Sequence, residues 1–311
     1  MKKKRKTYKL VLVLLSIIAI VITIDTGLGW FMNIYSSKNS LPGDYSKIDY
    51  LMKSANEDMI IVGSSTAINA FIPQIIEDSL NITCFNGGCN AQFMPFFRCI
   101  TENVLSRHKP KHLVLSIRPD ELYYNHNGRI NLLNIYYNKG NKSIDEIVEE
   151  NNGYKTTFLA SNLYRYNTIS WRILLSKLSS VDNMGDKGYV PHSIPSIAPQ
   201  LDDYRENLRR YKANRTTFNN LLAIADMCKN AEVDLIIVLT PIYSRLYDNE
   251  DDLISLKIIK EVCTEYNLRL INNSQNTLFL NSPDLFYDNN HLNYLGSKIH
   301  TEMFIEQIRE N

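Results

Sequence analysis

The chain has 311 residues, of which 44% are hydrophobic and 22% charged, a composition typical of a globular protein and not of a disordered one. Lysine and arginine number 34 and aspartate and glutamate 33, for a formal net charge of +1. Five of the basic residues are consecutive at positions 2–6, and no basic stripe with interleaved aromatic residues follows. We therefore expect no nucleic-acid partner. The length suits one membrane anchor followed by one α/β domain of roughly 260 residues.

An apolar segment follows the basic cluster. It runs through residues 10–24 without a charge, and Asp25 ends it. Crossing ~30 Å of hydrocarbon takes about 20 residues, a length that is reached when the flanking residues from Tyr8 to Phe31 are included. Because the lysines and the arginine precede the segment, we expect the N-terminus in the cytoplasm and the rest of the chain outside it. Membrane lipid is then a partner of this helix.

A cleaved signal peptide is the alternative interpretation of the segment. Residues 26–29 make a poor small-x-small cleavage site, so the uncleaved anchor is favoured. We therefore predict a cytoplasmic basic tail at residues 1–7, a transmembrane anchor at 8–34, a linker at 35–45 and an extracytoplasmic domain at 46–311. On this prediction the chain is a single-pass protein of a bacterial cell membrane.

The five cysteines are informative because an oxidising compartment outside the cytoplasm permits disulfides. Their number is odd, no two form a C-x-x-C pair and no zinc signature is present, so we expect neither a metal nor another cofactor. Most of them are expected to be small buried hydrophobic residues beside strands. A bridge between Cys84 and Cys89 remains an alternative.

Short apolar runs alternate with stretches of helical periodicity along the rest of the chain. Buried strands are predicted at residues 59–62, 82–85, 113–117, 233–239 and 269–271. Helices are predicted at residues 72–80, 93–107, 158–178, 201–229, 251–266 and 292–308. This alternation predicts a three-layer α/β/α sandwich with a central parallel sheet, of the flavodoxin-like type, and an insertion at about residues 121–200. Ligands of such sheets bind beyond the carboxyl ends of the strands.

Two serines follow the first predicted strand. In Val62-Gly63-Ser64-Ser65 a serine hydroxyl stands at a strand-to-helix turn, where the N-terminus of the helix stabilises negative charge. One interpretation of this turn is a catalytic nucleophile. The other is an ordinary helix cap, because serine and threonine are preferred at that position.

The turn before the last predicted helix contains an aspartate three residues ahead of a histidine, Asp288 and His291. The carboxylate can accept the Nδ1–H of the imidazole across a single turn, which leaves Nε2 free as a general base. The alternative is a helix-capping cluster of aspartate and asparagine in which His291 is only a solvated loop residue.

Asn86, Gly87 and Gly88 follow the second predicted strand. Paired glycines allow backbone N–H groups to approach an oxyanion closely. The same dipeptide also forms tight turns that have no ligand.

Together these features resemble the layout of the SGNH (GDSL-like) hydrolase superfamily, over residues 59–308. The resemblance implies that Ser65 is the nucleophile and that Ser64 stands where the family often has an aspartate. It implies that the N–H groups of Ser65 and Gly88 form the oxyanion hole, with Asn86 as an accessory residue.

The family has several short characteristic sequence motifs, called blocks. This sequence matches the last block well and the third block poorly. Asp288-x-x-His291 matches the last block closely and implies that both residues are catalytic. The third block usually carries an asparagine that donates to the oxyanion, but Asp120 occupies that place here. An ionised carboxylate cannot donate a hydrogen bond. Either one donor is therefore missing, or Arg118 or another side chain replaces it.

An α/β-hydrolase is the nearest competing fold, because Gly63-x-Ser65-x-Ala67 is close to its nucleophile elbow. In that fold several strands precede the elbow, whereas here it follows the first predicted strand. Its acid and histidine also lie on separate loops. We therefore disfavour this assignment.

The resemblance extends to membrane-anchored bacterial proteins of this superfamily that act on acyl groups of cell-surface polysaccharides. It implies a serine-dependent esterase or acyltransferase whose substrate is an O-acyl group, with acetyl favoured, on a surface or secreted glycan. A transferase would need an acyl donor delivered across the membrane by a partner membrane protein. The sequence does not separate hydrolysis from transfer.

A catalytically weak module that binds glycan or organises an envelope complex is the alternative function. Asp120 favours it, whereas the presence of Ser65, Asp288 and His291 favours an enzyme. Several tyrosines of the predicted insertion could stack on sugar rings, although core packing is the commoner use of such residues: Tyr123, Tyr124, Tyr136, Tyr137, Tyr154, Tyr164 and Tyr166.

Overall fold

The computed structural model describes residues 2–38, 41–123, 128–176, 185–195, 198–203, 212–250 and 253–310. The chain divides into two compact units. Residues 1–42 and 131–181 form the first, and residues 43–130 and 182–311 form the second. Part of the predicted insertion thus belongs with the N-terminal segment.

The second unit contains a five-stranded parallel sheet. Its strands are β1 (Met59–Gly63), β2 (Cys84–Asn86), β3 (His112–Ile117), β5 (Asp234–Leu239) and β7 (Arg269–Asn272), in the order β2-β1-β3-β5-β7. All five predicted strands are present, and the order is that of a flavodoxin-like sheet. The strand order reverses beside β1, which makes the carboxyl ends of β1 and β3 the expected ligand site.

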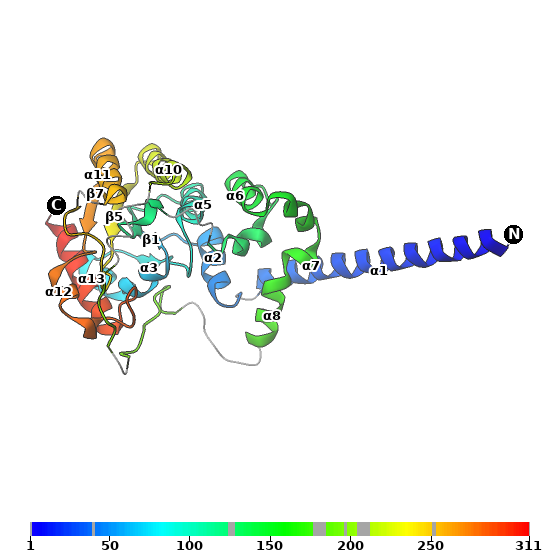
Figure 1. Cartoon of the computed structure of the whole chain (residues 1–311), viewed down its shortest axis with the longest axis horizontal. Coiled ribbons are helices and arrows are strands. Elements are labelled where there is room, and N and C mark those ends of the chain that lie inside the picture. The colour runs from blue at the N-terminus through cyan, green and yellow to red at the C-terminus, as the bar shows by residue number, and fades with distance from the viewer. Residues whose placement is uncertain are drawn as a thin grey trace. The chain divides into compact units, whose positions relative to one another are not determined.

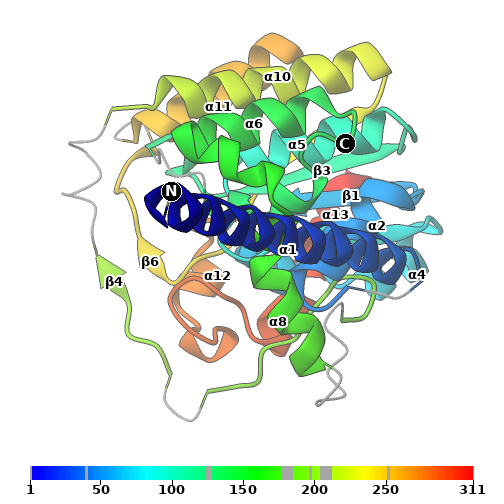
Figure 2. The same cartoon turned by 90° about the vertical axis from the view of Figure 1, so that its right-hand side faces the viewer.

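Helices cover both faces of this sheet (Figures 1 and 2). α3 (Ser65–Ala70), α4 (Pro73–Leu80) and α13 (Tyr294–Arg309) lie together on one face. α5 (Met94–Leu105), α10 (Arg215–Ala231) and α11 (Ile254–Tyr266) lie together on the other. The predicted three-layer α/β/α sandwich with a parallel sheet is therefore confirmed.

The core under α13 fixes the last helix against the first strands. Met59 and Ile61 of β1 belong to the same buried cluster as Phe71 and Phe304. The rings of Phe71 and Phe304 meet edge to face with centroids 5.1 Å apart. Because α13 is anchored near α3, the loop before α13 is brought to the carboxyl end of β1.

Two predicted helices differ from the structure. The helix predicted at 201–229 begins only at Arg215, because the Asn214 side chain caps α10 by accepting the Thr217 N–H at 3.0 Å. Before it, β4 (Asp202–Asp203) pairs with β6 (Ser244–Arg245), and residues 204–211 lie outside the described part of the chain. Over residues 158–176 the helix predicted at 158–178 is divided into shorter elements, which belong to the first unit, and residues 177 and 178 lie outside the described part of the chain.

The described residues of the first unit form helices. Its elements are α1 (Lys2–Lys38), most of η2 (Ile130–Tyr136), α6 (Lys142–Asn152), η3 (Gly153–Ala160), α7 (Asn162–Arg165) and α8 (Asn167–Ser176). Within α1, Lys6–Tyr35 is long and apolar enough to cross a membrane, a test that a signal sequence also passes. The helix continues to Lys38, so the predicted linker at 35–45 is helical at its start.

The described residues of the second unit also form shorter elements, and the cysteines lie within this unit. Those elements are α2 (Asp44–Lys53), η1 (Glu121–Tyr123), α12 (Thr277–Leu280) and η5 (Pro283–Leu285). All five cysteines are buried and free, so the alternative of a Cys84–Cys89 bridge does not hold in the structure. Burial raises the pKa of the Cys89 thiol to about 12, as expected of an inert packing residue.

Candidate active site

Ser65, His291 and Asp288 converge at the carboxyl end of β1. His291 Nε2 lies 2.8 Å from Ser65 Oγ, and His291 Nδ1 lies 2.8 and 2.9 Å from the two carboxylate oxygens of Asp288. An ionised carboxylate only accepts hydrogen bonds, so the neutral imidazole carries its proton on Nδ1 and offers Nε2 to the serine hydroxyl. The arrangement can remove the Ser65 proton during nucleophilic attack.

The turn that presents Ser65 is set by close packing at the end of β1. A Cβ on Gly63 would lie 2.5 Å from the Ser116 carbonyl oxygen, so only glycine lets β1 and β3 approach there. Ser64 caps α3, since its Oγ accepts the Thr66 N–H at 3.4 Å. The cap interpretation of the two serines therefore applies to Ser64, which leaves the Ser65 hydroxyl for His291.

A narrow loop holds Asp288 and His291. The Tyr287 N–H donates to the His291 carbonyl at 2.8 Å, and Asp288 Oδ1 accepts the N–H groups of Asn290 and His291 at 2.8 and 2.9 Å. Burial opposes ionisation of Asp288, but these bonds and the imidazole outweigh it and lower the pKa of the carboxyl. Asn293, not Asp288, caps α13 by accepting the Gly296 N–H.

The Gly88 N–H, a predicted oxyanion donor, has an acceptor within the chain. It donates to Asn86 Oδ1 at 3.0 Å. Asn86 is buried, and its amide also donates to the carbonyls of Ala67 and Phe71 at 2.8 and 2.9 Å. These bonds fix the side chain that captures the Gly88 N–H. The Ser65 N–H, at the first position of α3, has no acceptor within its own helix.

Asp120 does not stand as an isolated carboxylate. It is fully buried, and Arg118 donates to it through Nε at 2.9 Å and Nη2 at 3.0 Å. Arg118 Nη1 also donates to Asn290 Oδ1 at 2.8 Å. The pair therefore neutralises the charge that would repel an oxyanion, and it places a guanidinium beside the loop of His291.

Sequence reasoning did not find Lys47. This α2 residue is buried, and its Nζ donates to the carbonyls of Gly88 and Gly188 at 2.8 and 2.6 Å. Burial lowers the pKa of its ammonium. Lys47 thus holds the glycine turn after β2 in place through these two hydrogen bonds. No local pattern marks it, because the contacts span 41 and 141 residues.

His192 is a second residue that sequence reasoning did not find. Its ring stacks on Tyr287 with centroids 4.3 Å apart, and it meets the His291 ring edge to face at 5.8 Å. Burial, and then the neighbouring His291, lower the pKa of His192, which favours its neutral form. The His192 imidazole thus lies directly beside the His291 ring.

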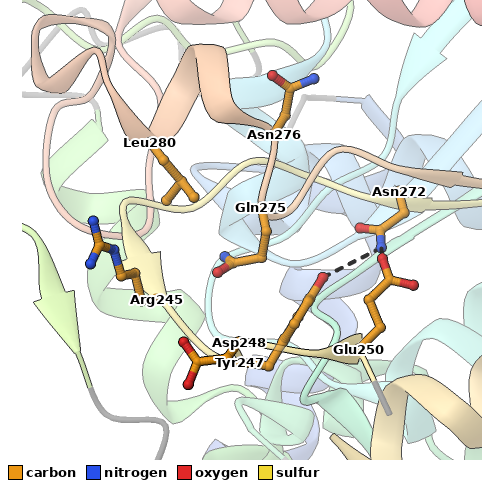
Figure 3. Close-up of a pocket in the computed structure, with 8 residues that line it drawn as sticks. All are labelled: Arg245, Tyr247, Asp248, Glu250, Asn272, Gln275, Asn276 and Leu280. Carbon is orange, nitrogen blue, oxygen red and sulfur yellow. Dashed lines mark hydrogen bonds between the residues drawn. The ribbon is translucent and has the colours of Figure 1, made fainter. Parts of the chain in front are cut away.

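A cavity of about 450 Å³ opens beyond the end of β7 (Figure 3). Amide side chains line one side of it, including Asn272 and Gln275, and the segment after β6 lines the other. The Asn272 amide donates to Glu250 at 3.2 Å. Just before β6, the Tyr243 N–H donates to the Asn289 carbonyl at 2.9 Å, which ties this segment to the loop of His291.

Two other predictions concern metals and the insertion tyrosines. Among the described residues no group of three or more histidine, cysteine, aspartate or glutamate side chains is placed to hold a metal ion. Tyr136 and Tyr166 are buried, whereas Tyr154 is 79% exposed. The Tyr123 hydroxyl accepts the Ser255 N–H at 3.2 Å. Tyr124 lies outside the described residues.

No family model and no curated protein matches this chain. The chain is similar to the solved structure of a G-D-S-L family lipolytic protein from Desulfitobacterium hafniense DCB-2, with 10% identity and a TM-score of 0.41, over 80% of this chain and 98% of that one. It is also similar to a lipase/acylhydrolase from Enterococcus faecalis, with 11% identity and a TM-score of 0.39, over 81% of this chain and 95% of that one. An acylhydrolase from Bacteroides fragilis NCTC 9343 has 10% identity and a TM-score of 0.37, over 81% of this chain and 86% of that one.

Proposed function

We propose that the chain is a serine esterase or acyltransferase of the SGNH type. The contact between Ser65 Oγ and His291 Nε2 carries this proposal, because it joins a nucleophile to a base that a carboxylate orients. Ser65 attacks the ester carbonyl while His291 takes the hydroxyl proton. Asp288 holds the imidazole in the productive tautomer. His291 then protonates the leaving alkoxide, and a water or a second hydroxyl removes the acyl group from Ser65.

The developing oxyanion requires donors, and two are candidates. The Ser65 N–H lies at the start of α3, and the Arg118 guanidinium is held near the His291 loop by Asp120 and Asn290. Loss of one oxyanion donor slows such reactions by about 10²–10³-fold. With the Gly88 N–H bonded to Asn86, we expect turnover slower than that of an enzyme with a complete oxyanion hole.

We propose an O-acyl ester, with acetyl favoured, on a cell-surface or secreted glycan as the substrate. The basic cluster at the start of α1 supports an extracytoplasmic second unit, and the amide-lined cavity tied to the His291 loop would suit a polar substrate. If a glycan hydroxyl replaces water, the same residues transfer the acyl group. The donor would then come through a partner membrane protein.

Labelling of the full-length protein by a serine-reactive fluorophosphonate tests the enzyme proposal. Wild type and Ser64→Ala should be labelled, whereas Ser65→Ala should not. Hydrolysis of a small aryl acetate and release of acetate from an acetylated glycan separate generic esterase activity from the proposed substrate class. Labelling that survives Ser65→Ala would contradict the assigned nucleophile.

A catalytically weak glycan-binding or envelope-organising module is the second candidate. The bond from the Gly88 N–H to Asn86 favours it, because that bond engages a predicted oxyanion donor. This function predicts no fluorophosphonate labelling and no turnover of either ester, together with retention of the protein on an immobilised glycan. The two candidates therefore give opposite outcomes in the same labelling experiment.

A further inference from the structure

Asp25 is the feature of the first unit that the proposed catalysis does not explain. The apolar run before it covers residues 10–24, and 15 residues of helix span about 22 Å of the ~30 Å hydrocarbon layer. Asp25 therefore falls at or just inside the outer boundary of that layer if α1 spans a membrane. An unpaired carboxylate is costly there, so such residues are paired.

The start of α7 pairs Asp25 completely. Ser161 Oγ donates to Oδ1 at 2.6 Å and the Leu163 N–H to the same oxygen at 2.8 Å. The Asn162 N–H and side-chain amide donate to Oδ2 at 2.9 and 3.2 Å. A carboxylate thus replaces its water shell with four donors that come from a segment more than 130 residues away in the chain.

The same face of α1 is shaped to receive α7. A Cβ on Gly29 would lie 2.6 Å from the Asn162 side chain, so glycine permits the close approach, and Met32 one turn later is buried. All described side chains from Lys6 to Ile24 are exposed. Asp25 is partly buried and Gly29 and Met32 are buried, and their spacing of three to four residues places them on one face of the helix. In Figure 1 the N-terminal half of α1 stands clear of the other elements of this unit, and α7 lies against its C-terminal half.

Apolar and basic side chains are exposed around this junction. Tyr154, Phe158, Leu163 and Trp171 are 79, 52, 44 and 68% exposed. Lys155 and Arg172 beside them are also exposed. We call these six residues the collar. In Figure 1 α8, which carries Trp171, runs across the axis of α1 and not along it, as a helix lying in a membrane surface does.

We propose that the collar is a membrane-binding surface that lies in the lipid headgroup region around the anchor helix. Aromatic side chains concentrate at that depth, and lysine and arginine pair with lipid phosphates. The occupant is the bilayer that α1 enters, because Asp25 fixes the collar to the level at which the apolar run ends. On the same grounds α1 is retained and not cleaved, since cleavage within residues 26–29 would remove the carboxylate that α7 binds.

Tryptophan fluorescence tests the collar in the full-length protein, which contains two tryptophans, Trp30 and Trp171. In the Trp30→Phe, Trp171→Phe background, Phe158→Trp and Leu163→Trp place probes in the collar. Lys142→Trp places the matched control at the opposite end of α6 from η3. Each variant is reconstituted in vesicles of phosphatidylcholine with or without bromine on the acyl chains.

Bromine should quench the two collar probes by about twofold and leave the control almost unchanged, as expected of side chains at the hydrocarbon boundary. Trp171 in the Trp30→Phe variant is a further probe that adds no side chain, and protease resistance checks that each variant is folded. Quenching of the collar probes no stronger than that of the control would overturn the proposal. Because the inference rests on the proposed membrane anchor, carbonate extraction is run alongside: release from the membrane contradicts the anchor itself, whereas retention without quenching contradicts the collar alone.

Discussion

Arg118 Nη1 donates to Asn290 Oδ1 at 2.8 Å, which joins the residue after β3 to the residue before His291. The same guanidinium binds Asp120 through two further nitrogens. Asp120 therefore orients Arg118 and does not face the oxyanion as a bare charge. This relationship changes the expected effect of substitutions at both positions.

We expect Arg118→Lys to lower kcat for aryl acetate hydrolysis by roughly tenfold or more, because an ammonium cannot bind Asp120 and Asn290 with the same planar geometry. Asp120→Asn should also lower kcat, since it weakens the orientation of Arg118. The control is Arg98→Lys on α5. A rise in kcat for Asp120→Asn would show that the residue instead faces the oxyanion and that the amide restores a donor.

The members of the proposed triad should act as one unit. Ser65→Ala and His291→Ala should each remove nearly all turnover, and the double variant should be scarcely slower than either, because each loss alone disables attack. Asp288→Asn should be milder, since it perturbs the tautomer and orientation of His291 while the nucleophile remains. Rates on an aryl acetate and on an acetylated glycan measure these effects. Additive losses in the double variant would argue against the unit.

Lys47 should act as a positioning residue for the turn after β2. Lys47→Met removes the ammonium that donates to the carbonyls of Gly88 and Gly188, so we expect kcat to fall while KM changes little. A purely structural role would instead reduce the folded fraction and leave kcat per folded molecule unchanged. Kinetics normalised to active sites titrated with fluorophosphonate separate the two outcomes.

Glu121 should make stability depend on pH. Burial, and then the nearby Asp120, raise its pKa from 4.5 to about 8, and its Oε1 has no hydrogen-bond partner among the described residues. The unfolded chain ionises this carboxyl above about pH 4.5 while the folded chain keeps it protonated, so stability falls as pH rises from 4.5 to 8.

Glu121→Gln should remove that dependence. We expect its Tm to exceed that of wild type by roughly 5 °C or more at pH 8 and to match it near pH 4. Thermal unfolding of the detergent-solubilised full-length protein at the two pH values measures this difference. Glu150→Gln on the exposed face of α6 is the control, and equal Tm values for wild type and Glu121→Gln at pH 8 would contradict the buried, protonated carboxyl.

Local sequence determined the strands and the pairing of Asp288 with His291 in the candidate site. Continuous apolar runs such as residues 235–239 are typical of a buried strand, and Asp288 and His291 interact across a single turn whose geometry their spacing sets. The length and apolar character that would let α1 cross a membrane are likewise properties of local composition. These features depend on neighbours within a few residues, so the sequence can be interpreted directly.

Only the tertiary structure decided the partners of isolated polar groups. The acceptor of the Gly88 N–H, the arginine that neutralises Asp120 and the lysine beneath the glycine turn depend on which elements pack together. Asp25 is the clearest case, because its donors come from a helix more than 130 residues away. A buried or membrane-level polar atom must find a partner, but sequence spacing does not say which distant segment supplies it.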